Sequence, residues 1–156
     1  MKAFGRFTAL CWCVLAVAAV FAGTVQADAG GSSCHAINAT GAGQDLGGGN
    51  TRAQITDGGL LEGTTVGTFA ITGFSGTVAS IAGTVVFTVN RATLTVSVSG
   101  TLDVATGAFS ASGPVSGSTG KLAGATGSLL LSGVENLGDG SFTETVSGSI
   151  CAQLAP

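Results

Sequence analysis

The stretch Ala92-Thr93-Leu94-Thr95-Val96-Ser97-Val98-Ser99 decides the fold of this chain. Its apolar residues occupy every even position, and its hydroxyl-bearing residues occupy every odd one. Because the side chains of a β-strand alternate between two faces, this pattern predicts a strand with one apolar face and one hydroxyl-rich face. The preceding run, residues 81–89, alternates in the same way, with Ile81, Val85 and Phe87 on one face. The two runs together predict an antiparallel pair of strands.

The same alternation recurs along most of the chain. Further strand-like runs lie at residues 34–41, 51–57, 62–73, 101–104, 109–115, 128–134 and 142–151. Turn residues separate several of them, as in Asp57-Gly58-Gly59, Asn90-Arg91, Thr106-Gly107 and Asp139-Gly140. The 27 glycines and the lack of apolar residues at three-and-four spacing argue against helices after the first thirty residues. We therefore expect about eight antiparallel strands, with residues 41–50 (GAGQDLGGGN) as a Gly-rich loop or bulged corner.

Strands with one apolar face must bury that face. Without helices to cover it, the sheet can close on itself or pack against a second sheet. We expect an all-β fold, a closed antiparallel barrel of about eight strands, with a two-sheet β-sandwich as the alternative. A barrel that spans an outer membrane needs girdles of aromatic residues. The chain has no Tyr and its outward faces carry Thr and Ser, so we expect no membrane span beyond the N-terminal segment.

The first 27 residues have the layout of a secretory signal peptide. Lys2 and Arg6 precede an apolar run of about 16 residues, 7–22, and small residues follow it up to Ala27. An uncleaved membrane anchor is the alternative, although the run is short of the roughly 20 residues of a spanning helix. We expect residues 28–156 to form a single β-barrel domain that is secreted, either extracellular or periplasmic.

Only two cysteines remain once the signal peptide is removed. Cys34 and Cys151 form an even pair near the two ends of an exported chain, which predicts a disulfide bond. A bond between them would place the first and last strands side by side, with facing positions that sum to 185. His35, the only histidine, would then face Ile150, and roughly 20 Å would separate it from Glu144. This register argues against a catalytic pair of His35 and Glu144.

The charged residues exclude several classes of function. After removal of the signal peptide, three basic residues (Arg52, Arg91 and Lys121) stand against eight acidic ones, which argues against nucleic-acid binding. One histidine and two cysteines do not furnish a four-ligand zinc site. The loop at 41–50 lacks the lysine of a phosphate-binding loop. We therefore expect no catalytic residue, no metal and no cofactor.

A family resemblance comes from residues 117–127, GSTGKLAGATG. This segment resembles the Gly-Gly-Thr-Gly-Lys/Arg-Phe-Ala-Gly-Ala-x-Gly signature of the dirigent and allene oxide cyclase-like barrels, and looks closest to their small secreted bacterial members. Ser118 replaces a common Gly, and Leu122 replaces a common Phe. The resemblance implies an eight-stranded, calycin-like barrel with a central cavity. It implies no activity, because the acidic, basic and aromatic groups that the plant proteins use have no matching residues here.

Three functions remain open at this point. The first is a non-enzymatic exported barrel that binds a small apolar ligand, with Phe69, Phe87, Val96 and Glu144 as the expected pocket residues. The second, suggested by the family alone, is a cyclase or stereochemical guide. The third is a structural or surface-recognition protein that uses its Thr-rich outer faces. The oligomeric state cannot be inferred from the sequence.

Overall fold

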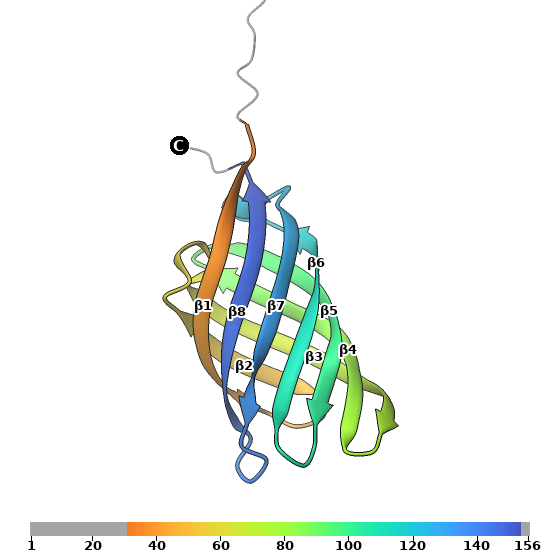
Figure 1. Cartoon of the computed structure of the whole chain (residues 1–156). Helices are drawn as coiled ribbons and strands as arrows, with labels where there is room; N and C mark the ends of the chain where they lie inside the picture. The colour runs from red at the N-terminus through yellow and green to blue at the C-terminus, as the bar shows by residue number, and fades with distance from the viewer. Residues whose placement is uncertain (1–30, 154–156) are drawn as a thin grey trace, which may run out of the picture.

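The computed structural model describes residues 31–153 of the 156-residue chain, so the expected signal peptide, residues 1–27, lies outside the described residues. Eight strands form one closed barrel, in which each strand pairs antiparallel with the next and β8 pairs with β1 (Figure 1). The strands are β1 (Ser33–Asp45), β2 (Asn50–Thr56), β3 (Gly63–Ser75), β4 (Val78–Val89), β5 (Ala92–Asp103), β6 (Ala108–Ser118), β7 (Thr126–Glu135) and β8 (Ser141–Ala152). The closed antiparallel barrel is confirmed, and the β-sandwich alternative is wrong.

The disulfide bond joins the first and last strands as expected. Cys34 and Cys151 are bonded and face each other across the β1–β8 pair. The register between these strands places His35 opposite Ile150 and Glu144 opposite Gly41. Figure 1 shows β1 and β8 running side by side along the front of the barrel. A bond of this kind forms in oxidising compartments outside the cytoplasm.

The expectation of a loop at residues 41–50 was wrong in its first half. Strand β1 continues through Gly41 and Gly43 to Asp45, and the chain reverses only between Asp45 and Asn50. In that turn Gly47, Gly48 and Gly49 all have positive φ, a conformation that glycine adopts at little cost. Glycine lowers the tendency of a segment to form a strand, but it is tolerated where another side chain approaches the backbone closely. This is the case for Gly41 and Gly43 of β1.

The two ends of the barrel are built differently. The connections β2–β3, β4–β5 and β6–β7 lie at one end together with the start of β1 and the end of β8, and we call this the closed end. The hairpins β1–β2, β3–β4, β5–β6 and β7–β8 lie at the other, the open end. In Figure 1 the closed end is at the top, where β1 begins and β8 ends, and hairpins of the open end project at the bottom.

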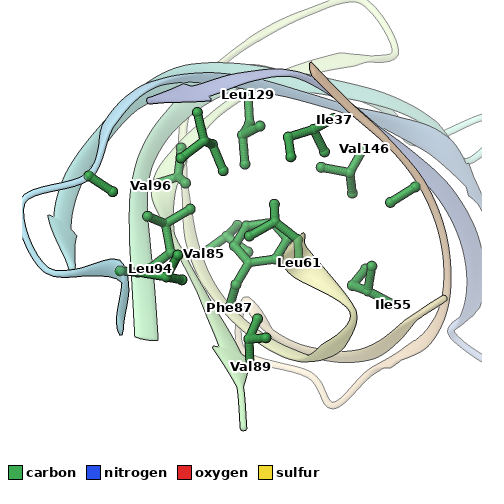
Figure 2. Packing of buried hydrophobic residues seen from close by; sticks show 14 of the residues in the cluster. Ile37, Ile55, Leu61, Val85, Phe87, Val89, Leu94, Val96, Leu129 and Val146 are labelled. Carbon is green, nitrogen blue, oxygen red and sulfur yellow. The ribbon is translucent and has the colours of Figure 1, made fainter. Parts of the chain in front are cut away.

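Large apolar side chains fill the closed end. Residues that are essentially inaccessible there include Ile55, Leu61, Phe87, Leu94, Leu122, Val146 and Ile150. Figure 2 shows side chains of this core pointing from all sides toward the axis of the barrel. Fully burying one such side chain stabilises a fold by about 1.5–3 kcal/mol. The closed half of the barrel is therefore a packed hydrophobic core rather than a channel.

Two single-turn 3₁₀ helices complete this core. Helix η1 (Gly59–Leu61) follows β2, and η2 (Gly120–Leu122) follows β6. Each carries one leucine, Leu61 or Leu122, that is fully buried in the core of the closed end. The turns thus insert side chains that the strands themselves do not supply. Among residues 31–153, no helix is long and apolar enough to cross a membrane.

Candidate functional site

A cavity of about 600 Å³ occupies the open half of the barrel. Its walls are formed by inward-facing side chains of the strands and by the β1–β2 turn. The lining residues are Asp45, Gly48, Gly49, Thr51, Phe69, Ala70, Ile71, Ile81, Val85, Val98, Leu102, Phe109, Ala111, Leu131, Glu135, Phe142 and Glu144. Most of these are apolar, and Ile71 is more than half exposed because it lies where the cavity meets solvent. The barrel therefore has a cavity that opens at one end and is bounded at the other by the hydrophobic core of the closed end.

Three of the large side chains that line the cavity have ring atoms close to glycines in its wall. A Cβ on Gly133 would lie 2.8 Å from the ring of Phe109. A Cβ on Gly67 would lie 2.5 Å from the ring of Phe69, and one on Gly43 would collide with the ring of Phe142. Three phenylalanines thus cover neighbouring glycines instead of reaching across the barrel. Phe109 and Phe142 also pack edge to face, with ring centroids 5.9 Å apart.

Glu144 is the charged residue that lies furthest inside the cavity. It extends from β8 between two glycines, Gly41 of β1 and Gly133 of β7, which face it in the two neighbouring strands. A Cβ on Gly41 would lie 2.8 Å from Cγ and 3.0 Å from Oε1 of Glu144. The glycine therefore makes room for the carboxyl group, which a longer residue would displace.

The carboxyl oxygens of Glu144 face the cavity and have no protein partner among the described residues. The residue is only 7% exposed, and no side-chain hydrogen bond within residues 31–153 involves its oxygens. Desolvation by the surrounding apolar side chains raises the pKa of Glu144 to about 7. Near neutral pH this group therefore exists in both forms and can donate or accept a hydrogen bond in the cavity.

Two further acidic residues lie closer to the mouth. Burial and the nearby charge of Asp45 raise the pKa of Glu135. The carboxylate of Asp45 accepts a hydrogen bond from the backbone N–H of Gly47 at 2.8 Å. Glu135 lies two residues from Gly133 on β7, which places it about 7 Å nearer the mouth than Glu144. The cavity thus carries one carboxyl group inside and two at its rim.

Acidic residues also occupy the hairpins of the open end. A hydrogen bond from the Ser141 hydroxyl lowers the pKa of Asp139 in the β7–β8 hairpin. The backbone N–H of Ala105 does the same for Asp103 in the β5–β6 hairpin. Both side chains therefore stay ionised and give the open end a negative potential.

Two of the four expected pocket residues line the cavity. Phe69 and Glu144 are lining residues, whereas Phe87 and Val96 are fully buried in the core of the closed end. Alternation shows that all four point inward, but it does not show toward which end of the barrel each one lies. His35 lies near the closed end, where its Nε2 is 2.8 Å from the hydroxyl of Ser33.

Several cavity residues were missed in the sequence. Asp45, Phe109, Glu135 and Phe142 all face inward at positions next to hairpins of the open end. Each of them lies at an inward position within two residues of a strand end. These positions can be recognised as cavity positions only when the register of the strands is known. Among residues 31–153, no group of three or more His, Cys, Asp or Glu side chains is placed to hold a metal ion.

The fold and the site define a class of protein: a small, disulfide-linked β-barrel with a cavity open at one end. Comparison with known proteins found no match to a family model, to a curated protein sequence or to a solved structure. The eight-stranded barrel implied by the resemblance of residues 117–127 is present, and this segment forms the end of β6, helix η2 and the start of β7. Membership of the dirigent and allene oxide cyclase-like family remains an interpretation of that segment.

Proposed function

We propose that this protein is an exported, non-enzymatic barrel that binds one small apolar ligand in the cavity of its open half. The observation that carries the proposal is a cavity of about 600 Å³ with a mostly apolar lining. Pockets for small ligands usually measure roughly 300–1,000 Å³, are largely apolar and contain a few polar groups. The packed core of the closed end gives the ligand a floor.

The disulfide bond supports the exported part of the proposal. Cys34 and Cys151 are bonded, and stable disulfides are rare in reducing compartments. The layout of residues 1–27 as a signal peptide agrees with this interpretation. The protein would then meet its ligand in the periplasm or outside the cell.

A cyclase or stereochemical guide is the second candidate, and Glu144 is the observation that favours it. A carboxyl group with a pKa of about 7 is suited to proton transfer near neutral pH. Binding is the better-supported function because the positions that face Glu144 in the two neighbouring strands, Gly41 and Gly133, carry no side chain that could act together with it. Recovery of the ligand unchanged after incubation would support binding, and conversion that is lost in Glu144→Gln would support the cyclase.

The binding function can be tested with a neutral fluorescent naphthylamine probe such as N-phenyl-1-naphthylamine. We expect saturable binding of one probe per barrel. Ala111, on the inner face of β6, lines the cavity, and Ala111→Trp should weaken probe binding at least about tenfold by filling that space. Ala108→Trp on the exposed face of the same strand is the matched control and should bind as the wild type does.

Equal probe binding by the wild type and Ala111→Trp would contradict the proposal, because the probe would then sit elsewhere. If Ala111→Trp does not fold, Leu131→Phe provides a smaller insertion on the adjacent wall. Native mass spectrometry of protein purified from its own host would then identify the natural ligand by its mass.

A further inference from the structure

The ionisable groups of the cavity all have the same sign. Its lining includes the carboxyl groups of Asp45, Glu135 and Glu144 and no basic side chain. The basic residues of segment 31–153 lie elsewhere: Arg52 is exposed on the outer face of β2, and Arg91 and Lys121 are exposed in connections of the closed end. The cavity is therefore neutral or negative, depending on pH, and carries no group that would attract an anion.

The carboxyl oxygens of Glu144 are open to the cavity and have no partner among the described protein residues. Its side chain is more than nine-tenths buried, lines the cavity and accepts no hydrogen bond from the barrel. Because these oxygens remain accessible from the cavity, a ligand there can reach them without displacing a protein partner. A ligand that brings its own hydrogen-bond donor would supply the missing partner.

The wall opposite Glu144 is apolar. Glu144 extends from β8, and β4 lies across the barrel from it in the strand order. Phe69, Ile81 and Val98 line the cavity from β3, β4 and β5. A ligand that reaches the carboxyl group with a polar end therefore places its body against these three side chains.

We propose that the ligand bound in this cavity is an amphiphilic cation, an apolar body that ends in a protonated amine held by Glu144. This inference rests on the proposed binding function. An ammonium group donates hydrogen bonds to a carboxylate, and such charge-assisted bonds are stronger than neutral ones. The rim residues Asp45 and Glu135 attract the same cation to the mouth and repel fatty acids and other anions.

The pH dependence of amine binding follows from the groups around Glu144. Among the described residues that line the cavity, the titratable groups besides Glu144 are Asp45 at the end of β1 and Glu135 at the end of β7. The cavity-lining side chains of β2 to β6 carry no charge. Without ligand, Glu144 ionises at about pH 7. An alkyl amine stays protonated well above that pH, so its binding should tighten as the pH rises from 6 to 8.

The test uses three competitors with one chain length: decylamine, decanol and decanoate. Each displaces the neutral naphthylamine probe from the full protein at pH 6 and at pH 8. At pH 8 the amine should bind at least about tenfold more tightly than the alcohol, and decanoate should bind most weakly. Glu144→Gln should remove most of the preference for the amine over the alcohol.

Glu62→Gln is the matched control, because it removes one negative charge from an exposed residue beside η1 at the closed end. This variant should keep the preference for the amine. Equal affinities for the three competitors in the wild type would overturn the inference and leave the proposed binding function intact. Failure of the probe and of all three competitors to bind would overturn the binding function itself.

Discussion

The carboxyl group of Glu144 makes the stability of the barrel depend on pH. Its pKa is about 7 in the folded protein, above its ordinary value of 4.5, because apolar side chains desolvate it. A raised pKa contributes stability that is fully present below pH 4.5 and is lost as the pH rises through 7. Between pH 4.5 and pH 8 the free energy of unfolding should therefore fall by up to about 3 kcal/mol from this group.

Replacement of Glu144 by Gln removes the titrating group and keeps its size. The variant should lose this pH dependence and should be more stable than the wild type at pH 8, as measured by urea unfolding at several pH values. Glu62→Gln, an exposed position, serves as the control and should follow the wild type. Identical pH profiles for Glu144→Gln and the wild type would show that the carboxyl group is solvated.

The glycines beside the cavity should tolerate little change. A Cβ on Gly133 would lie 2.8 Å from the ring of Phe109 and 2.9 Å from Cα of Glu144, and it would collide with the backbone oxygen of Thr143. We expect Gly133→Ala to lower the free energy of unfolding by about 1–3 kcal/mol through overpacking. Gly73→Ala is the control, because a Cβ there would meet nothing within 4 Å. Equal stabilities of the two variants in denaturant unfolding would contradict this assignment.

The strands could be predicted wherever alternation was uninterrupted. Residues 81–89 and 92–99 belong to β4 and β5, and the alternate apolar residues from Val85 to Val89 and from Ala92 to Val98 are buried as expected. The extension of β1 to Asp45 could not be predicted, because an inward glycine has the same signature as a loop glycine. The helices η1 and η2 were also missed, since a single turn of three residues shows no periodicity.

The disulfide bond links the first strand of the barrel to the last. Cys34 and Cys151 are 117 residues apart, and a cross-link of that separation stabilises a fold by about 4–5 kcal/mol in the chain-entropy model. The double variant Cys34→Ser/Cys151→Ser should therefore unfold at a much lower denaturant concentration than the oxidised wild type.

Unfolding of the wild type in a reducing agent distinguishes the loss of the disulfide bond from other effects of replacing the two cysteines. It should lower the midpoint of wild-type unfolding close to that of the double variant and should leave the double variant unchanged. A wild-type midpoint that does not respond to complete reduction would show that the β1–β8 hydrogen bonds alone keep the barrel closed.

The arrangement of the whole barrel, with a filled half and an open half, could not be predicted from the sequence. Phe69 and Phe87 share the inward face of the strands, yet Phe69 lines the cavity and Phe87 lies in the core. Whether an inward phenylalanine lines the cavity or lies in the core depends on the strand register. It also depends on leucines such as Leu61, which lies in the connection between β2 and β3 and packs into the core. These relations join residues that are far apart in the sequence and leave no local pattern.

The central claim is that one carboxyl group lies inside an apolar cavity that takes up a ligand. It is tested most directly by ¹³C NMR of protein labelled at the side-chain carboxyl carbons of its three glutamates, Glu62, Glu135 and Glu144. The spectrum of Glu144→Gln assigns the signal. We predict that the Glu144 signal titrates near pH 7 and moves when the neutral naphthylamine probe is added, while the Glu62 signal does not move. A Glu144 signal that titrates near 4.5 and ignores the probe would contradict the account.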